Sequence, residues 1–509
     1  MAATDIRESA SVAHIYGQNL VAAESLTAHG TDVSAYRYSP GSLKGTADWE
    51  MANGLNRFVI HESAHQPLDS IFPGLGLGPY GQWFNRHETW AGEARSWMDY
   101  LARSSYMLQQ GRAVADFLIY YGEDSNACSL YGFDMPQVPD GFNYDYANPR
   151  IVTELLKVQD GRIQAGKMTY SVLYLGKNVG RMSVPVLKAI VKLAQKGAQI
   201  CGHKPGGPAS MSDNAEEWNS LLSKLEACPN VHLGVPVSEA AQVCNLVPDV
   251  QYPEGEPLRF VHRNTPCADI YWINKPSDDF RRIKVSFRQT GRKPRVWHPE
   301  TGLTEDATYL MHDDRTEVTL DLVPNDAVFV VFGEKTDSKQ FAVPESTRQT
   351  LCELNGPWEV AFQPNRSAPE HAELPTLSSL TESDVPGIKY FSGKAVYSKD
   401  FSLDKQPEGR VAIDLGDVRE MARVKVNGKD CGLVWKQPFR LDITDALREG
   451  ENKLEVEVTN TWTNRLIGDQ QPDCPRKITY TSYPFYNEHS MLRPAGLLGP
   501  VAIEVVVTP

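Results

Sequence analysis

Cysteine is scarce in this 509-residue chain, and long apolar runs are missing. The eight cysteines are scattered without CxxC spacing, which argues against a zinc site and against a disulfide framework. We expect free thiols instead, such as Cys201 in its apolar surroundings. No apolar window is long enough to span a bilayer, so we expect no membrane partner. The first residues also lack the basic and apolar regions of a signal peptide, so no export signal is expected within this sequence.

Runs of basic residues and nucleotide-binding glycine motifs are likewise missing. The chain carries 51 Lys and Arg against 64 Asp and Glu, a formal net charge of -13, so we expect no nucleic acid partner. No GxGxxG motif follows a predicted strand, so we expect no nucleotide cofactor. No DxDxDG calcium loop is present either. The chain does contain 10 Trp and 21 Tyr, residue types that both carbohydrate sites and ordinary cores use.

The first 111 residues alternate between helix and strand patterns. The expected elements, in chain order, are Asp5–Tyr16 (helix), Leu20–Ala23 (strand), Leu43–Gly54 (helix), Arg57–Ile60 (strand) and Glu88–Gly111 (helix). Each strand is followed by an ionisable residue, Glu24 after the first and His61 after the second. Such repeats are typical of a (β/α)8 barrel, which places its chemistry at the carboxyl ends of its strands. Glu24 is therefore either a catalytic carboxylate or the cap of the following segment.

The remaining residues divide into one α/β region and two all-β regions. Residues 112–235 predict strands at Ala113–Tyr121, Thr169–Leu175 and Ala198–Cys201, and helices at Val184–Gln195 and Asn214–Leu225. Apolar strands that alternate with helices predict a doubly wound, flavodoxin-like parallel sheet. Residues 236–348 contain short strands separated by turn signals, which predicts a β-sandwich. Residues 349–509 form a second β domain, in which Asn427-Gly428 is the strongest hairpin signal.

A long loop rich in Pro, Gly and aromatic residues follows His61. It is either an ordered binding loop or a packed surface loop. Its first residues, from His61 to His65, match the letters of the HExxH zinc motif. That motif holds zinc only when it lies on a helix, whereas here a strand precedes it and Pro67 follows. We therefore do not expect zinc.

Four stretches of the last domain resemble the galactose-binding-like jelly-roll module of several glycoside hydrolases. They are Ile413–Val418, Val424–Gly428, Pro438–Thr444 and Gly450–Val458. Alone, this resemblance implies only an accessory domain of a carbohydrate-active enzyme.

Further stretches narrow the resemblance to glycoside hydrolase family 106, the α-L-rhamnosidases. They include RFVHRNTPCADIYWINK (259–275), GRKPRVWHPETG (291–302), YFSGKAVYSKDF (390–401) and TNTWTNRLIGDQ (459–470). At the front, AHIYGQNLVAAES, NGLNRFVIHESAHQP and YMLQQGRAVADFLIYYGED continue the resemblance. It covers nearly the whole chain and implies that residues 1–111 are the carboxyl-terminal part of the catalytic barrel.

The resemblance implies an inverting hydrolase that removes terminal α-L-rhamnose from a glycan or glycoside. Such enzymes use a general acid and a general base roughly 6.5–9.5 Å apart. By position, Glu24 corresponds to the general base. Sugar contacts are expected from four residues of the same mouth: His61, His65, Gln66 and Trp90. Relatives use calcium near the sugar, but this sequence has no calcium loop from which the ligands could be assigned.

The sequence departs from the family pattern before the Ser11–Thr27 segment. Family members carry most of their barrel strands there, including an Asp-Ser-x-Glu stretch that holds the acid, and this sequence lacks that stretch. We therefore expect a partial barrel that is inactive alone, with the missing barrel half as a partner. The alternatives are a non-catalytic sugar-binding or scaffold protein, or another hydrolase with the same accessory domains, such as a β-galactosidase relative. Intact relatives are typically periplasmic or secreted, so the localisation of this chain stays open.

Overall fold

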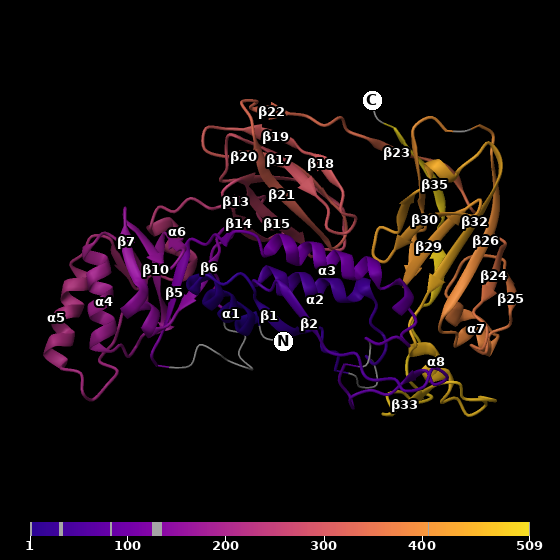
Figure 1. The fold of residues 1–509 in the computed structure, drawn as a ribbon, viewed down its shortest axis with the longest axis horizontal. Helices are drawn as coiled ribbons and strands as arrows, with labels where there is room; N and C mark the ends of the chain where they lie inside the picture. Colours follow the sequence, from indigo (N-terminus) through magenta and orange to yellow (C-terminus); the bar gives the residue numbers. More distant parts are fainter. Residues whose placement is uncertain (1–2, 30–33, 82–83, 125–134, 406, 508–509) are drawn as a thin grey trace.

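The computed structural model describes residues 3–29, 34–81, 84–124, 135–405 and 407–507. These residues form sheets of several architectures around the amino-terminal elements (Figure 1). An α/β unit lies on one side of these elements, a first β-sandwich lies above them, and a second sandwich lies on the other side. The protein is therefore multidomain, with mixed α/β and all-β parts. None of its described helices is both long and apolar enough to cross a bilayer.

The amino-terminal elements alternate between helix and strand, as the sequence predicted. They are α1 (Ala3–Tyr16), β1 (Ala22–Ser25), α2 (Pro40–Ala52), β2 (Arg57–Ile60), the 3-10 helix η1 (Ala91–Glu93) and α3 (Arg95–Leu108). Because β1 begins two residues later than predicted, Glu24 lies inside the strand and not beyond its end. The third helix begins at Arg95 and not at Glu88, because residues 88–94 form turns and η1.

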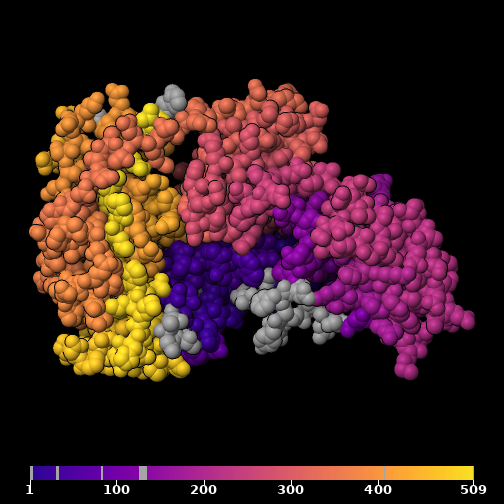
Figure 2. All heavy atoms as spheres, turned by 180° about the vertical axis from the view of Figure 1, so that it is seen from behind, coloured from indigo at the N-terminus to yellow at the C-terminus, as the bar shows by residue number. Residues whose placement is uncertain are grey.

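β1 and β2 form a two-stranded parallel sheet in which Glu24 lies opposite Val59. Every second residue of both strands is exposed, and Val59 keeps 52% of its surface accessible. Within the described ranges neither strand has a neighbour on its other side. In a closed barrel every strand is paired on both sides. Here the described residues of β1 and β2 pair only with each other, so this sheet has two open edges. The region shows a strand–helix repeat without a closed barrel, and Figure 2 shows it (indigo) between the second sandwich and the α/β unit.

The α/β unit is built on a five-stranded parallel sheet of order β12-β11-β10-β5-β6. Its strands are β5 (Phe117–Gly122), β6 (Tyr144–Ala147), β10 (Val172–Asn178), β11 (Gln199–Gly202) and β12 (Val231–Leu233). Helices α4 (Val184–Gln195) and α5 (Ala215–Glu226) cover one face and α6 (Val237–Val243) covers the other, with a buried core on each side. The π-helix η2 (Ile151–Leu155) leads into a small antiparallel sheet, β7 (Leu156–Gln159), β8 (Arg162–Ala165) and β9 (Met168–Tyr170). Because helices cover both faces of the five-stranded sheet, its central strands are apolar along nearly their whole length.

Two antiparallel sheets form the first sandwich, with one buried core between them. One sheet contains β13 (Val250–Gln251), β16 (Arg281–Phe287), β20 (Thr316–Leu322), β19 (Thr308–Met311) and β22 (Gln340–Phe341). The other contains β18 (Thr304–Asp306), β17 (Arg292–Trp297), β21 (Asp326–Lys335), β15 (Asp269–Lys275), β14 (Arg259–Asn264) and β4 (Arg112–Ala113). The pairing of β4 with β14 joins the end of the amino-terminal region to this sandwich.

The second sandwich also packs two antiparallel sheets around one core. One contains β23 (Thr347–Glu353), β35 (Ala502–Val507), β27 (Arg410–Asp414) and β31 (Arg440–Asp442). The other contains β25 (His371–Leu374), β24 (Trp358–Phe362), β26 (Lys394–Leu403), β32 (Gly450–Thr459), β29 (Met421–Val426) and β30 (Lys429–Val434). Short elements connect them: η3 (Leu380–Glu382), α7 (Pro386–Lys389), β28 (Asp417–Arg419), η4 (Thr444–Ala446), α8 (Thr463–Gly468) and β34 (Gly496–Gly499). The predicted hairpin is confirmed, since Asn427-Gly428 joins β29 to β30 with both residues at positive φ.

A buried polar network anchors the amino-terminal helices to the first sandwich. Asp48 of α2 accepts hydrogen bonds from Lys44 Nζ at 2.5 Å and from the Tyr100 hydroxyl of α3. Asn274 Nδ2 of β15 donates to the same carboxylate at 3.0 Å. All four side chains are buried, so the network fixes α2 and α3 to β15.

Aromatic packing and a charge cluster connect the same helices to the second sandwich. The rings of Trp97 in α3 and Trp435 beyond β30 lie 5.4 Å apart. Glu93 of η1 accepts from Lys394 Nζ at 3.0 Å and from Arg423 Nη2 at 2.8 Å. The elements that carry the predicted site are therefore held by both sandwiches.

Candidate active site

Glu24 lies near the carboxyl end of β1 with its side chain exposed. Its Oε1 accepts a hydrogen bond from the Thr27 hydroxyl at 2.7 Å. The parallel pairing of β1 with β2 brings the end of each strand together, and the His61 N–H donates to the Ser25 carbonyl oxygen at 3.2 Å. Glu24 and His61 therefore emerge from adjacent strands at one end of the sheet. A carboxylate in this position can accept a proton from a water molecule.

The His61 ring packs against the loop that follows β2. Its Nδ1 is buried and has no hydrogen-bond partner among the described residues. Gly81, at φ +64°, approaches so closely that a Cβ there would lie 2.4 Å from this nitrogen and 2.7 Å from Glu62 Cγ. The Gly81 N–H donates to the Ala28 carbonyl oxygen at 2.9 Å, which fixes the loop to the segment after β1. Glycine at this position lets the loop cover the His61 ring.

The other predicted sugar contacts are placed differently. His65 is exposed in the loop. Gln66 is 4% exposed, and its amide donates to and accepts from the Leu75 backbone at 2.6 and 2.9 Å. Trp90 is 2% exposed and donates to the Tyr38 carbonyl oxygen at 3.0 Å. In this structure Gln66 and Trp90 stabilise the loops, and neither presents a surface to a sugar, because their polar groups and rings are buried.

The loop between His61 and Trp90 is packed against the carboxyl-terminal part of the chain. β3 (Pro73–Gly74) pairs with β33 (Tyr480–Thr481), and Gly76 exchanges hydrogen bonds with Ser482. The Trp462 indole donates to the His87 carbonyl oxygen at 2.9 Å. Residues 61–65 are not helical, as predicted, so the HExxH letters lack the helix that zinc binding needs.

The same loop contains a buried carboxylate, Glu88, that the sequence analysis did not single out. Glu88 Oε1 accepts from the Thr89 N–H at 3.0 Å and hydroxyl at 3.2 Å, whereas Oε2 is buried without a partner among the described residues. Burial raises the pKa of Glu88 to about 8, although the bonds from Thr89 oppose the rise. Both ring nitrogens of the neighbouring His87 are buried and make no hydrogen bond to the described residues, although Nε2 lies 3.7 Å from Asp69 Oδ1. The sequence does contain a possible signal for this carboxylate, namely a His-Glu pair with aromatic residues on both sides. The prediction of a helix that begins at Glu88 hid this signal.

Calcium takes six to eight oxygen ligands and usually several carboxylates. Over the parts of the chain that the structure describes, no group of three or more His, Cys, Asp or Glu side chains is arranged to hold a metal ion. These residues do not by themselves fit a calcium site, so no chemical step is derived through calcium.

Two family models match the sequence. The model of the alpha-L-rhamnosidases, glycoside hydrolase family 106, matches residues 1–311. The model of the galactose-binding-like domain of family 2 glycosyl hydrolases matches residues 380–495. The second sandwich is therefore a galactose-binding-like domain.

Individual relatives extend this likeness over the whole chain. The structure of a rhamnosidase from Novosphingobium sp. PP1Y is 39% identical, with a TM-score of 0.90 over 99% of this chain and 49% of that chain. A curated protein of Formosa agariphila, provisionally named a beta-glucuronidase, is 24% identical over 98% of this chain and 64% of its own length. The chain thus spans about half the length of the rhamnosidase. Because the first family model covers more than half of the sequence, the chain belongs to glycoside hydrolase family 106, the alpha-L-rhamnosidases.

Proposed function

We propose that this chain takes part in the hydrolysis of terminal α-L-rhamnosides by an inverting mechanism, with Glu24 as the general base. The observation that carries the proposal is the exposed Glu24 carboxylate at the carboxyl end of β1, beside the end of β2. This is the end of the strands at which β/α enzymes place their chemistry. The likeness to the Novosphingobium rhamnosidase supports the substrate class.

In the proposed mechanism Glu24 accepts a proton from water as that water attacks the anomeric carbon. The Thr27 hydroxyl bonds one carboxylate oxygen at 2.7 Å and orients the group, which leaves the other oxygen for the water. A second carboxylic acid, roughly 6.5–9.5 Å away, protonates the leaving oxygen. His61 follows β2 at the same end and is proposed to contact sugar hydroxyls, together with the exposed His65.

We further propose that activity requires additional barrel strands, which supply the acid. The support is the open sheet formed by β1 and β2, whose described residues lack outer neighbours and leave Val59 exposed. Pairing along these edges would bury the exposed strand faces and enclose the mouth around Glu24. On this proposal the 509-residue chain alone turns over substrate negligibly.

The test measures release of p-nitrophenol from p-nitrophenyl α-L-rhamnoside. We expect no turnover by the chain alone, and turnover when it is joined to the part of the Novosphingobium rhamnosidase that it does not match. In the joined protein, Glu24→Gln should lower kcat by at least about a hundredfold, since general-base contributions are typically 10²–10⁴-fold. The matched control is Glu359→Gln, at an exposed position of β24. Clear turnover by the chain alone would refute the need for further strands, and an active Glu24→Gln variant would refute the base.

A further inference from the structure

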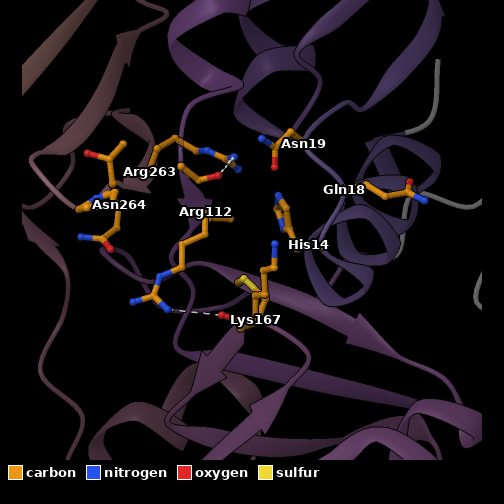
Figure 3. A pocket seen from close by; sticks show the side chains of 13 residues that line it. His14, Gln18, Asn19, Arg112, Lys167, Arg263 and Asn264 are labelled. Carbon is orange, nitrogen blue, oxygen red and sulfur yellow. Dashed lines mark hydrogen bonds between the residues drawn. The ribbon is translucent and has the colours of Figure 1, made fainter.

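A second pocket lies at the opposite end of β1 from Glu24. Its volume is about 510 Å³, which is within the range of small-molecule sites. It is bordered by the residues that follow α1, by β4, by the turn between β8 and β9, and by the end of β14. The lining residues are His14, Gly17, Gln18, Asn19, Gly111, Arg112, Ala113, Lys167, Met168, Arg263, Asn264, Thr265 and Pro266 (Figure 3).

The lining of this pocket is basic in a protein that is acidic overall. Four lining residues are basic, namely His14, Arg112, Lys167 and Arg263, and none is acidic. The whole chain, by contrast, has a formal net charge of -13. Positive groups that converge in a concave site raise the local concentration of anions.

Arg263 is the buried charge of this pocket. Its side chain is 3% exposed, and its Nε and Nη2 donate to the carbonyl oxygens of Gln110 at 2.8 Å and Gly111 at 3.1 Å. Burial lowers the pKa of Arg263 to about 10, so the group still carries its charge at neutral pH. Its third nitrogen, Nη1, makes no hydrogen bond to any described residue, and no described carboxylate lies within 4.0 Å of the guanidinium. The buried Asp145 carboxylate, to which His14 is bonded, favours the charged form of Arg263 but does not contact its guanidinium directly. An anionic ligand in the pocket would add a counter-ion in direct contact.

The other basic groups surround the same space. His14 Nδ1 is bonded to the buried Asp145 at 2.9 Å, which leaves its Nε2 for the pocket. Lys167 Nζ makes no hydrogen bond or ion pair with described residues, and its side chain points toward His14 (Figure 3). Arg112 Nη1 reaches only the Lys167 carbonyl oxygen, at 3.5 Å. Three cationic or imidazole donors are thus available to one ligand.

Neutral amides complete the lining. The Asn19 side chain makes no hydrogen bond to any described residue and lies near Arg263 in Figure 3, whereas Gln18 points away. Asn264 donates its Nδ2 to Asp269 at 2.8 Å, which leaves its Oδ1 as an acceptor. Amide groups can donate to and accept from hydroxyls, so the lining suits a hydroxylated anion better than a bare ion.

We propose that this pocket is a binding site for a sugar-sized, hydroxylated anion, such as an acidic monosaccharide or a sugar phosphate. Arg263 forms the floor and neutralises the anionic oxygens, Lys167 and Arg112 bind them from the rim, and Asn19 and Asn264 bind hydroxyls. The site is independent of the proposed hydrolysis, because it lies at the other end of β1.

Calorimetric titration of the 509-residue protein tests this site directly. The probes are galacturonate, glucose 6-phosphate, neutral glucose and inorganic sulfate, at low and at moderate salt. We expect saturable binding of at least one sugar anion, weakened by salt, with no binding of glucose and weaker binding of sulfate. The two sugar anions distinguish a carboxylate site from a phosphate site. Absence of saturable binding by both, or equal binding of glucose or sulfate, would overturn the proposal.

Two variants assign the binding to this pocket. Lys167→Gln, at an exposed turn position, should weaken binding of the sugar anion about tenfold, since it removes one charged hydrogen-bond donor. Lys157→Gln is the matched control, because Lys157 is exposed on β7 of the same small sheet and does not line the pocket. Thermal unfolding should be the same for both variants. Equal affinity of the two variants would place the binding elsewhere and overturn the assignment.

Discussion

Two carboxylates of the amino-terminal region, Glu24 and Glu88, differ in their surroundings. Glu24 is exposed and accepts a hydrogen bond from the Thr27 hydroxyl, which suits a group that must take a proton from water. Glu88 is buried, and its pKa of about 8 means that its carboxyl group is protonated at neutral pH. The sequence predicted Glu24 because an acid follows a short apolar run. It could not predict the burial of Glu88, whose neighbour His87 accepts a hydrogen bond from Trp462, far along the chain.

The protonation of Glu88 predicts a change of stability with pH. The folded-state pKa of about 8 lies above the ordinary pKa of 4.5 for a glutamate carboxyl group, so between these pH values the folded protein keeps a proton that the unfolded chain has released. Stability from this group is therefore full below pH 4.5 and is lost as pH rises through 8. Glu88→Gln should be more stable than the parent by up to about 5 kcal/mol at pH 8.5 and nearly equal at pH 4.5, measured by urea unfolding. The same difference at both pH values would contradict this prediction, and Glu359→Gln controls for the loss of a charge.

At the level of single elements, α2 and α3 depend on the Asp48 network. The sequence predicted both helices, although α2 spans Pro40–Ala52 and not Leu43–Gly54, and α3 spans Arg95–Leu108 and not Glu88–Gly111. The spacing could not show that Lys44 and Asp48, one turn apart in α2, lie buried against Tyr100 and Asn274. From the sequence alone, a Lys and an Asp one turn apart in a helix predict a solvent-exposed ion pair. Their burial becomes apparent only from the packing of α2 against β15.

Breaking this network should destabilise the protein strongly. Asp48→Ala leaves the buried Lys44 ammonium without its counter-ion, and we expect a loss of about 3–5 kcal/mol in the free energy of unfolding. The double variant Lys44→Met with Asp48→Leu should recover much of this loss, because it removes both charges and keeps the volume. Denaturant unfolding of both variants provides the measurement. If the double variant were as unstable as Asp48→Ala, the loss would not come from the unpaired charge.

At the scale of the whole molecule, the galactose-binding-like domain holds the loop that covers the candidate site. The Trp462 ring stacks on Phe72 with centroids 6.0 Å apart, and the Arg366 guanidinium lies 4.3 Å from the Trp462 ring centre. The Tyr486 hydroxyl donates to the Ala35 carbonyl oxygen at 2.5 Å. The domain is therefore part of the support of the site and not a separate appendage.

Removing this contact should loosen the loop. Trp462→Ala deletes a buried ring and the hydrogen bond to His87, so we expect faster tryptic cleavage after the exposed Arg86 and a loss of about 3–5 kcal/mol. Trp462→Phe keeps most of the ring and should have a smaller effect on both. Unchanged cleavage after Arg86 in Trp462→Ala would show that the domain does not hold the loop.

The sequence predicted the parts of this molecule that local patterns determine. Arg57–Ile60 and Val184–Gln195 have the predicted bounds, because their apolar periodicity decides them. Long-range pairing was not predictable. The Tyr480 N–H donates to the Phe72 carbonyl oxygen, although the two residues are far apart in the sequence, and β4 pairs with β14 of the first sandwich. Neither contact has a local signal in the sequence. Trp90 was predicted as a sugar contact from its position, yet the packing of distant segments buries it.

The role of Glu24 is tested most directly by chemical rescue. In the joined protein with Glu24→Ala, azide can replace the attacking water and needs no general base. We expect azide to restore turnover of p-nitrophenyl α-L-rhamnoside and to give β-L-rhamnosyl azide, the inverted product, by proton NMR. No rescue by azide, or a rhamnosyl azide of retained α configuration, would contradict Glu24 as the base of an inverting rhamnosidase.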